Sequence, residues 1–345
     1  MRIHTTTVST TAARLGMATG LAAAFTIGAY AGSAIAAEKF PTKEIQIISH
    51  AAPGGGTDVT ARMMMIRSRR ELAKGNPEYK DTGAVINVVY KRGGSGKVAH
   101  EYLMSRPADG HTLIALTQTH FYTIALGKSP LKGPELVGVA RAMDDPTFIV
   151  VGKNSKYKTI EDLIAASKDK PLNWGVSQIG GTEHVGLARF AKAAGIKFKV
   201  VPFGSGGKMV QALLSNAIDA TLPNVSEAGG QIEDGTVRPL LLLDKARLPA
   251  YKNVPSSHEK GWQLTVTTTR GYAVKAGTPP EVIKALEKGI LAAMKHDVFA
   301  GYLRGSGLDP KTSPAGSKVW TDQIQEEIKI AREALGELGL LKKKK

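Results

Sequence analysis

Short apolar runs of strand length alternate along the chain with longer stretches in which apolar residues recur every three or four positions. This alternation is typical of α/β proteins with largely parallel sheets, because each helix then connects one strand to the next. Nine runs are predicted to be strands, at residues 44–49, 86–90, 112–117, 148–152, 173–177, 199–203, 220–224, 237–243 and 271–275. The fold class that the pattern predicts is therefore α/β.

Two of the predicted helices have well-marked starts. Thr159 is followed three residues later by Asp162, which approximates a capping box at a helix start. Thr278 and Pro279 are predicted to supply the N-cap and the first position of another helix. The last predicted helix covers residues 319–335 and carries an apolar face.

Four glycine-rich turns follow predicted strands and precede predicted helices. They lie at residues 52–58, 92–96, 177–182 and 203–207, and they read APGGGTD, RGGSG, SQIGGT and FGSGG. A helix that begins at such a turn exposes unpaired backbone N–H groups at the positive end of its dipole. One such turn is an ordinary connection, but four of them, each with a serine or threonine, predict a site for a small anion.

The glycine turns fall into two pairs, one before and one after Asp145. This division predicts two α/β lobes joined by crossing segments near residues 140–148 and 255–270, with the ligand cleft between them. The predicted lobe 1 comprises residues 37–142 and 260–345, and the predicted lobe 2 comprises residues 143–259.

The first 36 residues have the features of a signal peptide. Arg2 and Arg14 give a positively charged start, and an alanine-rich apolar stretch follows them to about residue 35. Residues 34–36 read AIA, which predicts cleavage after Ala36. A retained anchor helix is the alternative, but Gly20 and Tyr30 interrupt the stretch. We therefore expect an exported, periplasmic protein.

The net charge and the absence of cysteine restrict the possible partners and kinds of site only partly. The formal net charge is +16, and loss of the leader removes two basic residues and no acidic one, which lowers it to about +14. Four of these charges belong to the terminal run Lys342–Lys345, which is interpreted as a solvated tail or an expression remnant. A basic surface attracts nucleic acid, anionic membrane or acidic solutes alike. The chain has no cysteine, which excludes disulfides and thiolate metal sites.

The glycine turns do not match the known nucleotide motifs. Gly96-Lys97 and Gly207-Lys208 lack the serine or threonine that follows the lysine of a P-loop, and Val59 replaces the third glycine of a dinucleotide fingerprint. Neither an H-E-x-x-H motif nor a G-x-S-x-G motif is present. No cofactor, metal ligand or catalytic residue is predicted.

An ordered set of motifs resembles the Bug-type solute receptors of tripartite tricarboxylate transporters. The set is FPTKEI at 40–45, APGGGTD at 52–58, GGSG at 93–96, ADGHTL at 108–113, GGTEH at 180–184, VPFGSG at 201–206 and AGTP at 276–279. The resemblance spans nearly the whole chain after the leader. No single motif is decisive, whereas their order is specific.

The resemblance implies a two-lobed periplasmic-binding-protein fold of type II, a small carboxylate ligand and a membrane permease as partner. A monomer is expected. Carried over to this sequence, the ligand-binding candidates of the family are Ala52, Thr57, Asp58, Gly94, Ser95, Thr117, Ser177, Thr182, His184, Gly204 and Ser205. Which carboxylate is bound stays open at this point, as does a role in transport or in signalling.

Two positions leave alternatives open. The family commonly has Pro-Phe where this chain has His50-Ala51, so His50 either offers a hydrogen bond to the cleft or points away from it. Asp58 is an unusual neighbour for an anion. It either accepts backbone N–H groups at a helix start and pairs with Arg62, or it orients a water or a ligand amine.

Two other classes of function compete with a receptor. A secreted enzyme acting on an anionic substrate would need an acid–base pair, and Asp58 with His184 is the only pair the sequence offers. A nucleic-acid-binding protein would suit the charge. The predicted export signal and the absence of a stripe of basic and aromatic residues count against it.

Overall fold

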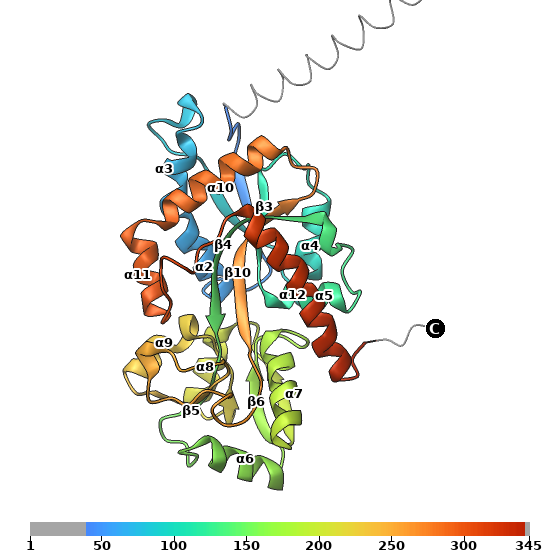
Figure 1. Cartoon of the computed structure of the whole chain (residues 1–345), viewed down its shortest axis with the longest axis vertical. Helices are drawn as coiled ribbons and strands as arrows, with labels where there is room; N and C mark the ends of the chain where they lie inside the picture. Colours follow the sequence, from blue (N-terminus) through green and yellow to red (C-terminus); the bar gives the residue numbers. More distant parts are fainter. Residues whose placement is uncertain (1–38, 342–345) are drawn as a thin grey trace, which may run out of the picture.

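The computed structural model describes residues 39–341 and has two α/β lobes (Figure 1). The predicted leader, residues 1–36, and the run Lys342–Lys345 lie outside the described residues. Within residues 39–341, no helix combines the length and the apolar character needed to cross a membrane.

We define lobe 1 by its five-stranded sheet and the helices that cover it. The sheet order is β2 (Ile86–Tyr90), β1 (Ile45–Ser49), β3 (Thr112–Leu116), β10 (Thr267–Lys275) and β4 (Leu136–Pro146). Strands β2, β1 and β3 are parallel, and β10 is antiparallel to both β3 and β4. The helices of this lobe are α2 (Gly56–Met65), α3 (Ser68–Ala73), α4 (Lys97–Met104), α5 (Gln118–Ala125), α10 (Pro280–Met294), α11 (Asp297–Gly305) and α12 (Ser317–Glu337).

Lobe 2 is defined by a second five-stranded sheet. Its order is β7 (Phe198–Pro202), β6 (Leu172–Val176), β8 (Ala220–Thr221), β5 (Phe148–Gly152) and β9 (Val237–Leu242). Strands β7, β6 and β8 are parallel, whereas β5 is antiparallel to β8 and β9. The helices are α6 (Ile160–Asp169), α7 (Thr182–Ala194), α8 (Gly206–Leu214) and α9 (Val225–Glu233). Short 3-10 helices occur in both lobes at Pro77–Tyr79, Gly94–Gly96, Gly133–Glu135 and Pro249–Tyr251.

Each sheet is covered on both faces, which explains why strands such as β3 and β5 are buried along their whole length. In β5, Ile149 and Val151 belong to the cluster under α6 and α7, whereas Phe148 and Val150 belong to the cluster under α8 and α9. Successive side chains of a strand point to opposite faces, so a strand between two helical layers buries every residue. These layers fix the positions of the loops at the strand ends.

Two strands connect the lobes. Strand β4 runs to Pro146, and β5 of the other sheet begins two residues later at Phe148. The returning chain enters lobe 1 through β10, which pairs with β4 from Thr267 opposite Pro146 to Lys275 opposite Leu136. The two connecting strands therefore form one antiparallel ribbon, visible between the lobes in Figure 1.

The sequence-based expectations are met for the α/β class and the two lobes, with two corrections. Strand β4 was not predicted, and the sheets are mixed rather than largely parallel. The mixed sheets have a simple cause. In each sheet, a strand that arrives from the other lobe is antiparallel to a neighbour, because it continues a crossing segment instead of following a helix. The predicted lobe boundaries at residues 142–143 and 259–260 stay a prediction.

Two predicted helix starts have different outcomes. The capping box of α6 is confirmed, because Thr159 Oγ1 accepts the Asp162 N–H at 3.1 Å and Asp162 accepts the Thr159 N–H at 3.0 Å. The predicted cap at Thr278 is wrong by one residue. Helix α10 begins at Pro280 with Pro279 as N-cap, since a residue before proline avoids the helical conformation.

Candidate functional site

The loops at the carboxyl ends of the parallel strands of both lobes face one another. Ligand sites of open α/β sheets lie at this edge. Five helices begin here, namely α2, α5, α7, α8 and α9, and residues from the first turn or the N-cap of each line one cavity. The cleft predicted from the glycine turns therefore corresponds to a cavity between the lobes.

Six of the eleven predicted ligand-binding residues line this cavity. Lobe 1 contributes two threonines, and lobe 2 contributes three hydroxyl residues and one glycine: Thr57, Thr117, Ser177, Thr182, Gly204 and Ser205. The fold thus brings together side chains that are up to about 150 positions apart in the sequence. Their hydroxyl groups and the neighbouring helix N-termini could donate hydrogen bonds to an anion.

The other five predicted residues, Ala52, Asp58, Gly94, Ser95 and His184, do not line the cavity. The Ala52 carbonyl accepts the Gly55 N–H, and His184 Nδ1 accepts the Gly180 N–H at 2.9 Å. The Ser95 hydroxyl donates across the lobes to the Ile179 carbonyl at 2.9 Å. Binding of the ligand by these five residues stays a prediction.

Asp58 has the structural role that one interpretation of the sequence gave it. Its carboxylate accepts the Gly54 N–H at 2.8 Å, the Arg62 Nε–H at 3.0 Å and the Tyr90 hydroxyl at 2.7 Å. Burial alone would raise the pKa of Asp58, but the hydrogen bonds from Gly54, Tyr90 and Arg62 outweigh it and lower that pKa. Asp58 thus stays ionised and fixes the first turn of α2.

Arg270, which the sequence analysis did not single out, lines the cavity and is almost completely buried. Its Nη2 lies 3.0 Å from Asp145 Oδ2 and donates to Asn224 Oδ1 at 2.9 Å. Arg270 belongs to no local motif. Only the ribbon of β4 and β10 brings it beside Asp145, and Arg270 lies one residue before the strand predicted at 271–275, so no sequence signal marked it.

Two glutamates of lobe 2, Glu183 and Glu227, also line the cavity and were not predicted. Glu183 accepts the Ser177 hydroxyl at 2.6 Å, and burial raises its pKa. Burial raises the pKa of Glu227 to about 7, with smaller contributions from Glu183 and Asp145, while the charge of Arg270 opposes the rise. The cavity therefore has an acidic wall that faces a buried arginine.

His50 is buried and is one of the residues that line the cavity, and a hydrogen bond from it to a ligand stays a prediction. Its ring packs edge-on against the ring of His120, with 4.3 Å between the ring centroids. His120 Nδ1 lies 2.6 Å from His100 Nε2. Burial lowers the pKa of His50 to about 3 and that of His100 to about 4. These three buried histidines are therefore neutral at physiological pH.

The glycines of the turns allow the two lobes to approach closely. A Cβ on Gly55 would lie 3.1 Å from the Ser205 Cβ, and a Cβ on Gly181 would lie 3.2 Å from the Thr119 hydroxyl. The cavity has a volume of about 30 Å³, room for roughly one or two water molecules. A larger ligand needs more space, which a bend between the lobes would supply.

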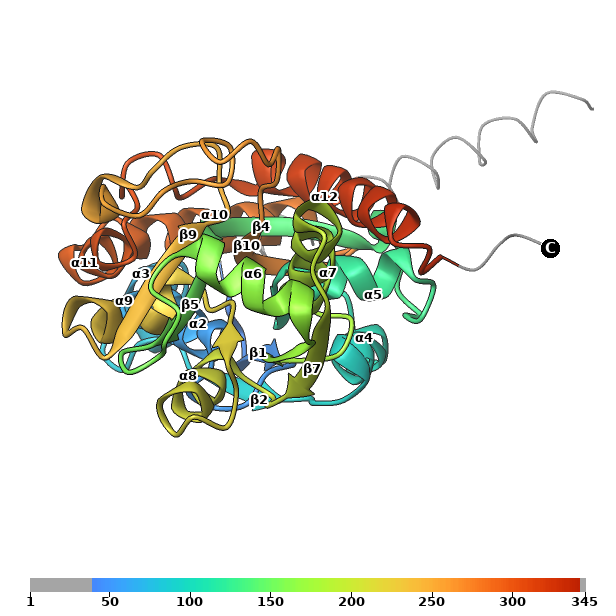
Figure 2. The ribbon, with the colours of Figure 1, turned by 90° about the horizontal axis from the view of Figure 1, so that it is seen from below.

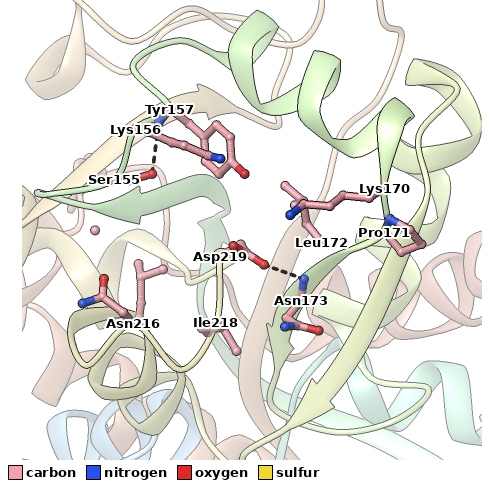
Figure 3. Close-up of a pocket in the computed structure, with 12 residues that line it drawn as sticks. Ser155, Lys156, Tyr157, Lys170, Pro171, Leu172, Asn173, Asn216, Ile218 and Asp219 are labelled. Atoms are coloured by element: carbon pink, nitrogen blue, oxygen red, sulfur yellow. Dashed lines mark hydrogen bonds between the residues drawn. The ribbon is translucent and has the colours of Figure 1, made fainter.

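A second cavity, of about 400 Å³, lies at the far side of lobe 2 from the cleft (Figure 3). Its wall includes Lys156, Lys170 and Asp219, and Asp219 accepts the Asn173 N–H at 2.8 Å. This cavity lies at the edge of the sheet that holds the amino end of β6, and both lysines are exposed. It lacks the convergence of hydroxyl groups and helix N-termini seen in the cleft.

The described histidines and carboxylates do not gather into a metal centre. Among residues 39–341, no group of three or more potential metal ligands has a suitable arrangement. The chemistry that the cleft can offer is hydrogen bonding and charge pairing.

Comparison with known proteins gives a consistent result. Residues 70–340 match the family described as the tripartite tricarboxylate transporter family receptor, TctC. Protein BugT of Bordetella pertussis is 25% identical over 309 residues, which cover 87% of this chain and 91% of that protein.

Solved structures show the same fold. MatC from Rhodopseudomonas palustris, with bound malate, has a TM-score of 0.75 at 22% identity and covers 86% of this chain and 100% of its own. The periplasmic binding protein BugD has a TM-score of 0.79 at 18% identity and covers 88% of this chain and 100% of its own. Since the family match extends over most of the sequence and agrees with the order of motifs, this chain belongs to the tripartite tricarboxylate transporter receptor family.

Proposed function

We propose that the protein is an extracytoplasmic solute-binding receptor that captures a small carboxylate anion and delivers it to a tripartite tricarboxylate-type transporter. The observation that carries the proposal is the convergence of five helix N-termini on one cavity that is also lined by hydroxyl groups from both lobes. Backbone N–H groups and hydroxyls donate hydrogen bonds, and a carboxylate is the small organic group that accepts several at once.

The ligand-binding residues proposed on this basis are the six predicted residues that line the cavity. Thr57 and Thr117 would act from lobe 1, and Ser177, Thr182, Gly204 and Ser205 from lobe 2. A hydrogen bond to a charged group contributes roughly 1.5–3 kcal/mol, so three or four of them can support micromolar affinity, which needs about 8 kcal/mol net.

The location and the partner follow from the family. We propose that the leader is cleaved near Ala36, that the mature receptor acts in the periplasm as a monomer, and that it docks on the membrane subunits of its transporter. Solved relatives of this fold include a protein described as a periplasmic binding protein.

Binding is favoured over catalysis by the positions of the two residues that an enzyme would need. Asp58 is hydrogen-bonded to Gly54, Arg62 and Tyr90 within lobe 1, and His184 accepts the Gly180 N–H within lobe 2. Neither residue lines the cavity. A receptor returns its ligand unchanged, so incubation followed by mass spectrometry of the recovered ligand tests this point.

The proposed function can be tested by thermal unfolding of the mature protein with a panel of mono-, di- and tricarboxylates at fixed salt. A ligand at about 100 times its Kd should stabilise the folded state by about 2.7 kcal/mol. Thr182→Val, which removes a buried hydroxyl of the cavity wall, should weaken binding by roughly a factor of 3 to 10, whereas the exposed Thr82→Val serves as control. A panel without any stabilising acid would contradict the proposal.

A further inference from the structure

The cleft holds more acidic than basic side chains. Arg270 is the cation among the described residues that line the cavity, and Asp145 already pairs with it at 3.0 Å. Glu183 and Glu227 line the same cavity, and Glu227 Oε1 lies 4.0 Å from Arg270 Nη2. One guanidinium thus faces three buried carboxyl groups, two of which are in the cavity wall.

Glu227 uses the hydrogen-bond donors that an anionic ligand would use. Although it belongs to lobe 2, its Oε1 accepts the N–H of Gly56, the first residue of α2 in lobe 1, at 3.1 Å. Its Oε2 accepts the Asn224 N–H at 3.3 Å. A Cβ on Gly206, at the start of α8, would overlap the same carboxylate. Hence a carboxylate of the protein itself lies against the N-termini of α2 and α8.

A ligand that carries only carboxylates would add negative charge to this wall. Like charges repel strongly in a site that excludes water, because the effective dielectric constant is low. The raised pKa of Glu227 and of Glu183 reflects their own burial and, for Glu227, the repulsion by its acidic neighbours. A positive group on the ligand would remove this repulsion and pair with both glutamates.

Two further groups point to a ligand with several hydrogen-bonding atoms. Thr182 Oγ1 and His50 Nδ1 are buried without a hydrogen-bond partner, and both residues line the cavity. Buried polar atoms normally have partners, so a ligand that supplies them is the simplest explanation. None of the described residues that line the cavity is Phe, Tyr or Trp, which disfavours a quaternary ammonium group.

We propose that the cleft selects a small carboxylate that also carries a protonated amine, an amino-acid-like zwitterion, and that Glu183 and Glu227 receive its ammonium group. The carboxylate of the ligand is held by the threonine hydroxyls of the cavity wall, by Ser205 and by Arg270. This inference rests on the proposed receptor function and specifies its solute class.

The experiment compares acids that differ in one group. Isothermal titration at pH 7.5 of the mature protein measures Kd for L-aspartate, L-malate and succinate, and for L-glutamate and glutarate. In each series the amine-bearing acid should bind at least tenfold more tightly than its counterpart. Equal or tighter binding of malate, succinate or glutarate would overturn the inference while leaving the receptor function intact. If none of the five acids bound, both proposals would fail.

Glutamine variants of Glu183 and Glu227 test whether these side chains bind the ammonium group of the ligand. Glu227→Gln retains an oxygen that can accept the Gly56 N–H, and Glu183→Gln retains one for the Ser177 hydroxyl, so both are expected to fold. Each should reduce the preference for aspartate over malate at least fivefold. A preference that stays unchanged in both folded variants would contradict the assignment of the glutamates. If one variant does not fold, the preference for aspartate over malate in the other variant and in the wild type still tests the proposal.

Discussion

Arg270 of strand β10 and Asp145 of strand β4 form a buried ion pair, with 3.0 Å between Nη2 and Oδ2, at the point where the two connecting strands leave lobe 1. Asp145 also accepts hydrogen bonds from the N–H and the hydroxyl of Ser226 in lobe 2. The pair thus joins both connecting strands and reaches into the other lobe.

Removal of one member of this pair should destabilise the protein strongly. Asp145→Ala leaves a buried guanidinium without its partner, which typically costs about 3–5 kcal/mol. The neighbouring Asp144→Ala serves as control, because Asp144 is half-buried and its contact with Arg141 is worth roughly 0–1 kcal/mol. Urea denaturation of both variants measures the difference. If both variants lost the same free energy of unfolding, the buried pair would contribute no more to stability than the contact of Asp144 does.

A methyl group at Gly56 should hold the lobes apart. A Cβ there would lie 2.5 Å from Glu227 Oε1 and 2.7 Å from Arg270 Nη2, whereas a Cβ on Gly207 would have no atom within 4 Å. Gly56→Ala is therefore expected to raise the Kd of the bound carboxylate about tenfold and to enlarge the radius of gyration in small-angle scattering. Gly207→Ala should change neither quantity, and similar behaviour of the two variants would refute this explanation.

The buried histidines should make stability depend on pH. The pKa of His100 is about 4 in the folded protein and about 6.5 when unfolded, so below pH 6.5 the unfolded chain binds more protons. Stability due to this residue is thus lost as the pH falls from about 6.5 towards 4, by roughly 2 kcal/mol at pH 5. Glu227, whose pKa is raised to about 7, acts in the opposite direction between about pH 4.5 and 7.

A variant separates the two effects. The free energy of unfolding of His100→Gln should fall less than that of the wild type between pH 7.5 and pH 5, so the gap between the two proteins narrows by about 2 kcal/mol. His258→Gln, outside the histidine cluster, controls for loss of a histidine. A gap that stays constant over this range would contradict the neutral state assigned to His100.

Processing of the leader can be tested directly. Protein recovered from the periplasm of an expressing cell should begin at Ala37, as measured by intact mass and N-terminal sequencing. A large charged residue before the cleavage site, Ala36→Arg, should block processing and leave the precursor in the membrane fraction. Recovery of unprocessed wild type would instead favour the anchor.

The sequence predicted most of what depends on local patterns. Runs such as 148–152 and turns such as 203–207 carry their own signals, and they led to the two-lobed α/β fold and to the expectation of an anion site. Thr57 and Ser205 of the cavity wall were named through the resemblance to the receptor family. Strand β4 was missed because half of it, including Asp144-Asp145-Pro146, is not apolar.

The acidic wall and its arginine could not be predicted in this way. Glu227 is a capping-box residue of α9 and reads locally as a helix start. Arg270 becomes a cavity residue only through the pairing of β10 with β4. Both depend on contacts between segments more than 40 positions apart, which a single sequence does not encode as a pattern.

Helix α12 of lobe 1 ends beside α7 of lobe 2 (Figures 1 and 2), where Lys192 Nζ donates to the Glu337 carbonyl at 2.9 Å. The strands of lobe 2 form one uninterrupted stretch of chain between β4 and β10. A chimaera that carries lobe 2 of a relative would thus need only two splice points, in residues 146–148 and 264–267, with α12 and α7 chosen as a matched pair. The family's architecture thereby lends itself to recombination of half-sites.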